Sequence, residues 1–233
     1  MALQKFSKGE AIRFGWNTMK SNLGFFVTLL AIVLIVTGLV YYSSISIMSS
    51  IRRSVYFPNY YFVTILSYCF TIVQWFLYII IEMCLIRVAI RFCDNEAGEF
   101  TDLFRCAPMF LKYVFGMILY RLICVLGTLL LIIPGIIWSI KFQFFGYFIV
   151  DKGCGPIEAL KSSSMITRGA KWDLFLFNIL LILINLAGVL CLLVGLFATI
   201  PTAVVALAFV YRKLQAHAEK TLLEEQVLEK QLF

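Results

Sequence analysis

Residues 127–153 read GTLLLIIPGIIWSIKFQFFGYFIVDKG, and the interpretation of the chain starts from this stretch. Two apolar runs meet in it at Pro134 and Gly135, and the second run ends at the polar pair Asp151 and Lys152. Proline has no N–H for a helix ladder and glycine readily takes a left-handed φ, so Pro134-Gly135 predicts a turn or a sharp kink. Apolar runs that meet at a turn, with no polar loop between them, are typical of a transmembrane hairpin.

The composition of the whole chain indicates a membrane protein. The 233 residues are 62% hydrophobic and 14% charged, whereas soluble proteins have about 25% charged residues. Mean hydropathy is +0.93. The net charge of +7 does not indicate a nucleic-acid partner. The basic residues flank the apolar runs in short segments, as they do in the cytoplasmic loops of membrane proteins.

The apolar runs predict an all-α fold, a polytopic membrane helix bundle with about six transmembrane helices arranged as three hairpins. The predicted spans are residues 23–42, 60–90, 113–133, 136–150, 174–198 and 202–213. A second tight reversal is predicted at residues 199–202, around Pro201, between the last two spans. Residues 1–213 would then form a single transmembrane domain, and residues 214–233 a charged helical tail.

Basic residues determine the predicted orientation. The N-terminal segment, residues 91–112, residues 151–173 and the tail are rich in Lys and Arg, whereas the opposite side offers only Arg52 and Arg53. Short basic loops stay in the cytoplasm. We therefore expect a multi-pass protein with both termini cytoplasmic.

A polar amphipathic helix is predicted before each hairpin, at residues 9–22, 99–112 and 156–170. In the first of them the apolar face is formed by Ile12, Trp16, Met19 and Leu23. In the third, Pro156 fits the first helical position, Gly169 fits the end, and the serines at 162–164 are assigned to the polar face. Such helices lie in the membrane interface, so the predicted partners are lipids with anionic headgroups. The alternative for the first segment is an ordinary cytoplasmic tail.

The sequence contains no recognised catalytic or metal-binding motif. Its seven cysteines include no CxxC pair. The glycine-rich phosphate loop, the HExxH zinc pattern and the GxSxG nucleophile pattern are also missing from the sequence. We therefore predict no catalytic residue, no metal site and no cofactor.

Ionisable residues inside the predicted spans are the candidate site. Each costs at least ~2.5 kcal/mol at mid-membrane unless it is paired or hydrated. Glu82, Arg121 and Lys141 each lie about 13–15 Å above the cytoplasmic ends of their spans at 1.5 Å per residue, so they are expected to meet at one level. Asn178 lies slightly nearer the interface. The cluster is a buried packing element, or a set of side chains that snorkel to water at the cytoplasmic rim. The functional alternative is a small polar cavity open to the cytoplasm, whose excess of one positive charge would hold a lipid phosphate or another anion.

Three parts of the chain resemble a known family. They are GEAIRFGWNTMKSNLGFF (9–26), LLLIIPGIIW (129–138) followed by YFIVDKGCGPIEALKSS (147–163), and IPTAVVALAFVYRKL (200–214). They resemble a large group of uncharacterised bacterial integral membrane proteins, related to the membrane domain attached to some glycerophosphodiester phosphodiesterases. The resemblance implies a polytopic bacterial membrane domain with no established catalytic residues. The catalytic barrel of the phosphodiesterases has no room in this chain, so their activity is not transferred.

Two functional hypotheses follow. The first is a non-enzymatic bacterial inner-membrane protein that acts in membrane organisation or as an accessory subunit. The alternative is a small transporter or a lipid- or anion-handling protein that uses Glu82, Arg121 and Lys141. A protein partner or a second copy of the chain is left open in both.

Overall fold

The computed structural model describes residues 6–53, 60–96, 107–191 and 195–232. All regular structure in these ranges is helical, which confirms the all-α prediction. The elements are α1 (Lys8–Ser21), α2 (Leu23–Arg53), α3 (Tyr60–Cys93), the 3-10 helix η1 (Ala107–Met109), α5 (Phe110–Leu130), α6 (Ile132–Phe142), α7 (Phe145–Lys152), α8 (Pro156–Ile166), α9 (Lys171–Leu190) and α10 (Leu196–Leu232).

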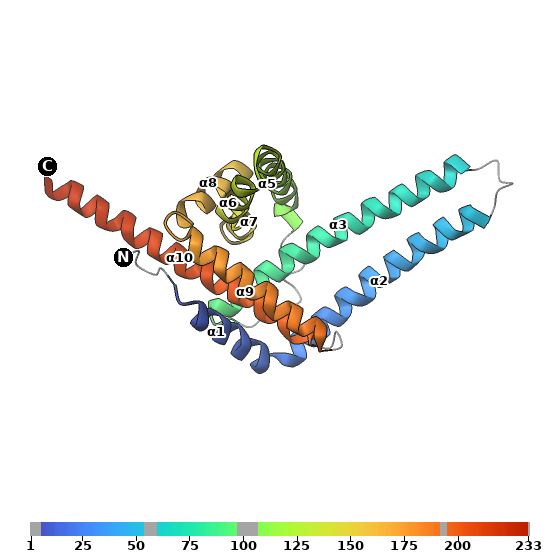
Figure 1. The fold of residues 1–233 in the computed structure, drawn as a ribbon, viewed down its shortest axis with the longest axis horizontal. Coiled ribbons are helices and arrows are strands. Elements are labelled where there is room, and N and C mark those ends of the chain that lie inside the picture. Colours follow the sequence, from blue (N-terminus) through green and yellow to red (C-terminus); the bar gives the residue numbers. More distant parts are fainter. Residues whose placement is uncertain (1–5, 54–59, 97–106, 192–194, 233) are drawn as a thin grey trace.

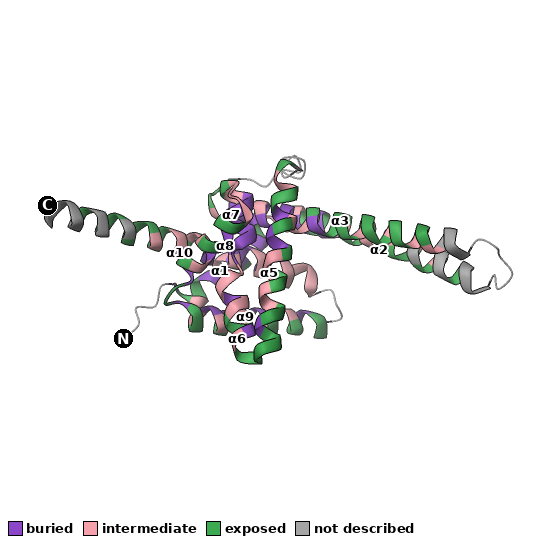
Figure 2. Cartoon of the chain, turned by 90° about the horizontal axis from the view of Figure 1, so that it is seen from above, coloured by how far each residue is buried: buried purple, intermediate pink, exposed green. Residues whose placement is uncertain are grey.

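Six helical stretches among the described residues are long and apolar enough to cross a membrane. They are Leu23–Ser43, Thr64–Cys93, Phe110–Leu130, Ile132–Lys152, Lys171–Leu190 and Leu196–Thr221. Consecutive stretches pack in pairs, α2 with α3, α5 with α6, and α9 with α10. The α2–α3 hairpin projects away from the other helices, and the buried residues concentrate where α3, α7 and α10 meet (Figures 1 and 2).

The α5–α6 hairpin turns at Leu131, before the expected turn at Pro134 and Gly135. Leu131 is extended, with φ −163° and ψ 147°, and it separates α5 from α6. Pro134 lies in the first turn of α6, where helical N–H groups have no partner within the helix. Gly135 does not have a positive φ. It is required for close approach, because a Cβ there would lie 2.9 Å from the Cα of Thr128 on α5.

The fourth membrane stretch is two helices, with a break at Gln143 and Phe144. The Phe144 N–H donates to Ser163 Oγ (3.1 Å), and Ser163 Oγ donates to the Lys141 carbonyl (3.0 Å). Thr167 Oγ1 donates to the same carbonyl (3.1 Å). Non-helical backbone at membrane depth needs such partners. Ser163 is fully buried, so its assignment to an exposed polar face of α8 was wrong.

Helix α9 ends at Leu190 and α10 begins at Leu196, so the reversal between them comes earlier in the chain than predicted. Pro201 is inside α10, so the predicted turn at 199–202 was wrong. A proline this close to a helix start removes one helical hydrogen bond without ending the helix. The reversal resembles that of α5–α6, because a Cβ on Gly195 would lie 2.8 Å from the Cα of Gly188. Facing glycines bring both helix pairs into contact.

Helix α1 packs against α10 through small residues. A Cβ on Gly15 would lie 2.5 Å from the carbonyl oxygen of Thr202. Trp16, which was expected on the apolar face, is 40% exposed. The buried face of α1 therefore overlaps the predicted apolar face at Met19, and Ile12 of the predicted face is partly buried against the same core. The buried residues of α1 are Ala11, Gly15 and Met19.

The other two predicted amphipathic segments differ in how far they are described. Helix α8 begins at Pro156 as expected, and Gly169 follows its end with a left-handed φ of 82°. Of the 99–112 segment, residues 99–106 lie outside the described residues, and the remainder forms η1 and the start of α5. The tail after residue 213 continues α10 without a break as far as Leu232.

Candidate functional site

One polar cluster ties three helices together at the end of α3. The Arg212 guanidinium on α10 donates to Asp151 at 2.7 and 3.0 Å, and to Asp94 through Nε at 3.0 Å and through a second, short contact. The Tyr211 hydroxyl donates to Asp151 Oδ2 (2.9 Å). We call Arg212, Asp94, Asp151 and Tyr211 the arginine clamp. The guanidinium and both carboxylates are hydrogen-bonded within the cluster, so the clamp is best explained as a structural element.

Glu82 lies on α3 and faces α5. Its carboxylate accepts a hydrogen bond from the hydroxyl of Tyr113, which is fully buried. Arg121, about two turns further along α5, interacts electrostatically with the same carboxylate. Two of the predicted residues, Glu82 and Arg121, are therefore brought into interaction by the fold.

Asn178 on α9 meets the break between α6 and α7. Its Nδ2 donates to Gln143 Oε1 at 2.8 Å. This bond leaves the Gln143 Nε2 buried without a hydrogen-bond partner among the described residues, and Asn185 Oδ1 is in the same condition. A buried amide atom without a partner is unusual in a folded protein.

These polar groups share a cleft of about 470 Å3 between α3, α5, α7, α9 and α10, which we call the lateral cleft. Its polar lining residues are Glu82, Tyr113, Gln143, Tyr147, Asn178 and Asn185. Its walls are mostly apolar and include Leu181, Ala203 and Leu207. Pockets of this size, with apolar walls and a few polar groups, are typical of small-molecule sites.

Lys141 does not line the lateral cleft, and neither does Arg121. The Lys141 ammonium lies 4.9 Å from the ring centroid of Phe142, and its carbonyl is bonded to α8. Of the four predicted residues, the cleft therefore contains Glu82 and Asn178. Arg121 reaches Glu82 only through its charge.

Sequence reasoning missed several residues of these clusters. Gln143 was passed over, although an amide within an apolar run is a signal of the same kind as Asn178. Tyr113 and Arg212 carried no such signal, because each stands at the edge of a predicted span, where tyrosine and arginine are ordinary. Among the described residues, no group of three or more His, Cys, Asp or Glu side chains is arranged to hold a metal ion.

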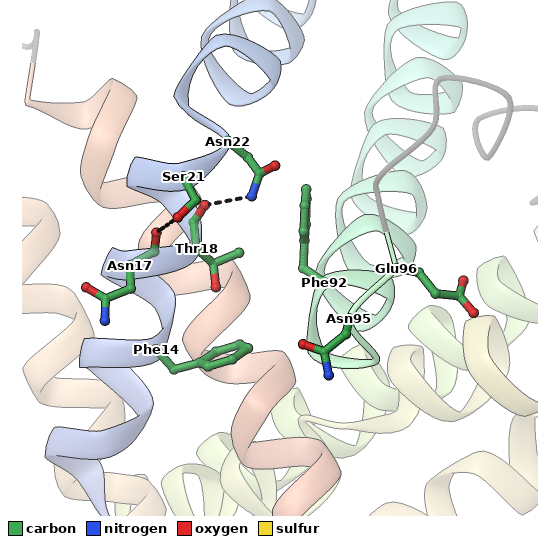
Figure 3. Close-up of a pocket in the computed structure, with 8 residues that line it drawn as sticks. All are labelled: Phe14, Asn17, Thr18, Ser21, Asn22, Phe92, Asn95 and Glu96. Carbon is green, nitrogen blue, oxygen red and sulfur yellow. Dashed lines mark hydrogen bonds between the residues drawn. The ribbon is translucent and has the colours of Figure 1, made fainter.

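A second cavity, of about 390 Å3, lies between the end of α1 and the end of α3, and we call it the hairpin-end cavity (Figure 3). The Asn22 amide donates to the Thr18 carbonyl across one side of it (3.1 Å). Its lining residues are Phe14, Asn17, Thr18, Ser21, Asn22, Phe92, Asn95 and Glu96.

Comparison with known proteins places the chain among proteins without an assigned role. The model of a family described as a domain of unknown function (DUF7847) matches residues 60–222. This match includes every residue that lines the lateral cleft.

Three similar proteins are uncharacterized. Mb2590 of Mycobacterium bovis is 27% identical over 227 residues, which cover 90% of this chain and 69% of the relative. MT2637 and Rv2560 of Mycobacterium tuberculosis match over the same shares at 27% and 26% identity. No solved structure matches the chain.

Proposed function

The chain belongs to the DUF7847 family, a domain family of unknown function, and from that premise we propose that it is a non-enzymatic membrane protein that binds a lipid in the lateral cleft. The observation that carries the proposal is the pair of buried, unpartnered amide atoms, Gln143 Nε2 and Asn185 Oδ1, in an apolar-walled cleft. An unmade buried hydrogen bond costs roughly 1–3 kcal/mol. A ligand would gain about that amount for each of the two hydrogen bonds it supplies, once small side-chain movements uncover the two atoms.

The two amide atoms define the chemistry of the ligand. Gln143 Nε2 is a donor and suits an ester carbonyl, whereas Asn185 Oδ1 is an acceptor and suits a hydroxyl. The apolar walls suit an acyl chain. The ligand class is therefore a lipid whose ester linkage and neighbouring hydroxyl lie in the cleft while its chain lies along α9 and α10.

Charge argues against an anion in the cleft. The charged side chain that lines it is the Glu82 carboxylate, and the two expected cations, Arg121 and Lys141, lie outside it. A phosphate beside Glu82 would meet like charge in a low-dielectric setting. We therefore do not propose the expected cavity in which an excess of positive charge holds an anion.

The ends of several helices support an orientation with both termini in the cytoplasm of a bacterial inner membrane. Lys8 pairs with Asp173 (3.0 Å), and Glu10 pairs with Lys213 (3.3 Å). These contacts bring the beginnings of α1 and α9 and the later part of α10 to one end of the bundle. That end carries the basic segments which the sequence assigns to the cytoplasm.

Exposed side chains on α8 and α1 suit a surface of anionic lipids. On α8 the exposed residues Ile157, Lys161 and Met165 share one face at spacings of four. On α1 the Lys20 ammonium lies 5.2 Å from the ring centroid of the exposed Trp16. Aromatic and basic side chains together favour the membrane interface.

The proposal fits a role in membrane organisation or as an accessory subunit. The relation to the membrane domains of glycerophosphodiester phosphodiesterases stays a prediction, as does a protein partner or a second copy of the chain. A membrane domain that only binds a lipid at its ester region needs no catalytic group of its own. Such binding would therefore suit an accessory domain.

The experiment is native mass spectrometry of the protein extracted with its surrounding lipid and then delipidated in steps. We expect the wild-type protein to retain one lipid after bulk lipid is removed. Ala203→Phe fills the cleft and should abolish retention. Asn185→Leu removes the acceptor and should weaken retention about fivefold to tenfold.

The matched control is Ala187→Phe, which places the same side chain on the exposed surface of α9. It should retain lipid as the wild type does. Equal lipid retention by Ala203→Phe and Ala187→Phe would refute the lateral cleft as the site.

A further inference from the structure

The hairpin-end cavity lies beside the ends of the first two membrane stretches. Asn22 directly precedes the first membrane stretch, and Cys93, which ends the second, is followed by the lining residues Asn95 and Glu96. The cavity therefore stands where both helices of the first hairpin leave the apolar layer. A group bound there is at the depth of lipid headgroups.

The polar lining of this cavity is mostly neutral. It has amide and hydroxyl side chains, and no lysine, arginine or histidine is among its described lining residues. The carboxylate of Glu96 accepts a bond from Arg91 Nε at 3.0 Å, which partly neutralises it. Among the described lining residues a phosphate would find no basic side chain, although α2 begins directly after the lining residue Asn22. The lining suits a ligand with several hydroxyl groups, because amides and hydroxyls both donate and accept.

Two aromatic rings line the hairpin-end cavity, and each packs against a further aromatic ring. Phe14 stacks on Phe209 of α10 with ring centroids 4.7 Å apart, and Phe92 packs on Phe26 of α2 at 5.2 Å. Figure 3 shows the Phe92 ring between Asn22 and Asn95. Fixed rings offer flat apolar faces to the C–H face of a saturated sugar-like ring, while its hydroxyls reach the polar groups around them.

Three polar side chains at the cavity have donors or acceptors that are not used within the described part of the chain. The Thr18 hydroxyl and the Asn95 amide make no side-chain hydrogen bond within the described part of the chain, and Asn22 keeps its Oδ1 free beside its one donated bond. Asn95 has a φ of 60°, a left-handed conformation that asparagine tolerates. That conformation ends α3 and places residue 95 at the cavity.

We propose that the hairpin-end cavity binds a neutral polyhydroxylated ring, of the hexose or cyclitol class. The ring is supplied either as the headgroup of a glycolipid or as a free sugar. The volume of about 390 Å3 is sufficient for one such ring. This site shares no lining residue with the lateral cleft and does not depend on the proposed function.

The test uses the full chain in a detergent without a sugar headgroup, since glycoside detergents would occupy the site. Saturation-transfer NMR is recorded with methyl glucoside and with myo-inositol as the free-ring arm. Native mass spectrometry in phosphatidylglycerol nanodiscs, with and without monoglucosyl diacylglycerol, is the lipid arm. Binding in both arms, or in the lipid arm alone, identifies a glycolipid headgroup, and binding of the free ring alone identifies a soluble sugar.

Two variants remove single groups without disturbing the fold. Thr18→Val deletes a hydroxyl at constant shape, and Asn95→Gly deletes an amide while keeping the left-handed φ. Each should lower affinity about fivefold to tenfold. Thr28→Val is the matched control, because the Thr28 hydroxyl bonds within α2 (2.8 Å to the Gly24 carbonyl) away from the cavity.

Absence of ring binding by the wild type in both arms would overturn the proposal, as would unchanged binding by the Thr18→Val, Asn95→Gly double variant. Displacement of the ring by inorganic phosphate would also overturn it, because the site would then be an anion site. Ala203→Phe, which blocks the lateral cleft, should bind the ring as the wild type does. Its result separates the two proposals.

Discussion

Arg212 shows how one residue connects segments that are far apart in the chain. Its guanidinium bonds Asp94, 118 residues earlier, and Asp151, 61 residues earlier. A planar fork with five donors can serve two carboxylates at once, whereas a lysine ammonium cannot hold the same geometry. Arg212 therefore holds α3, α7 and α10 in register.

Replacing Arg212 should destabilise the protein. We expect Arg212→Leu to lower the free energy of unfolding by about 2 kcal/mol, because two carboxylates lose charged hydrogen bonds in a half-buried setting. Arg212→Lys should lower it by about half as much. Thermal unfolding in mild detergent measures both changes.

The control is Lys220→Ala, which removes an exposed i,i+4 pair with Glu224. Such pairs contribute only about 0.3–0.5 kcal/mol. Equal losses in Arg212→Leu and Lys220→Ala would show that the arginine clamp does not stabilise the bundle.

At the scale of elements, two of the hairpins are built in the same way. Gly127 faces Gly135 in the α5–α6 pair, and Gly188 faces Gly195 in the α9–α10 pair. Without a hydrophobic driving force between helices in lipid, close van der Waals contact is what holds them together. Small residues at the crossing point make that contact, and a side chain there would separate the helices.

Gly135→Ala should therefore destabilise the α5–α6 hairpin by about 2 kcal/mol, the usual cost of forcing extra atoms into a packed contact. The added Cβ would lie 2.9 Å from the backbone of Thr128, which cannot move as a side chain end can. Gly24→Ala is the matched control, since nothing lies within 4 Å of a Cβ at Gly24. Thermal unfolding of both variants is measured in detergent. If the two unfolding curves coincide, Gly135 is not required for the close contact between α5 and α6.

The break in the fourth membrane stretch depends on one hydroxyl. Ser163→Ala leaves the N–H of Phe144 without its partner, while the carbonyl of Lys141 keeps Thr167. We expect a loss of about 1–3 kcal/mol in unfolding free energy. We also expect faster hydrogen exchange at Phe144, which mass spectrometry of the 141–150 segment can follow.

Ser162→Ala is the neighbouring control for Ser163→Ala. Ser162 is only half-buried, and its hydroxyl makes no hydrogen bond within the described residues. The variant should unfold as the wild type does. If it shows the same increase in exchange at Phe144, the effect belongs to α8 as a whole and not to the Ser163 bond.

At the scale of the molecule, two native cysteines report the orientation. Cys191 is exposed at the reversal between α9 and α10, and Cys154 lies between α7 and α8 at the opposite end. In variants that retain one of these cysteines, a membrane-impermeant maleimide should label Cys191 in intact spheroplasts. It should label Cys154 only after permeabilisation. The reverse pattern would refute cytoplasmic termini.

The labelling of Cys154 depends on pH. Burial raises the pKa of the Cys154 thiol, and the neighbouring Glu158 carboxylate raises it further. Because the thiolate is the reacting form, the Cys154 labelling rate should keep rising with pH beyond the range of an ordinary thiol, whose pKa is about 8.5. Permeabilised samples should therefore be labelled at alkaline pH. Otherwise weak labelling of Cys154 could be mistaken for inaccessibility to the maleimide.

The parts of the fold that sequence predicts well are those set by local composition. The count of six spans and the start of α8 at Pro156 follow from hydropathy and from a proline's backbone, and both need only neighbouring residues. The turns at Pro134 and Pro201 were misplaced for a related reason. Proline and glycine occur in turns, at helix starts and at close helix contacts. Which of these roles a given residue has depends on the helix that packs against it.

The sequence by itself determined an all-helical fold with six apolar stretches long enough to cross a membrane, because the hydropathy of each stretch depends on its own residues alone. The orientation of these stretches stays a prediction. Only the tertiary structure decided that Glu82 and Asn178 share a cleft with Gln143, that Lys141 lies outside it, and that Ser163 is buried. These facts depend on how helices distant in the chain rotate against one another. That rotation is set by small residues such as Gly15 and Gly135 at the contacts, where hydropathy carries no information.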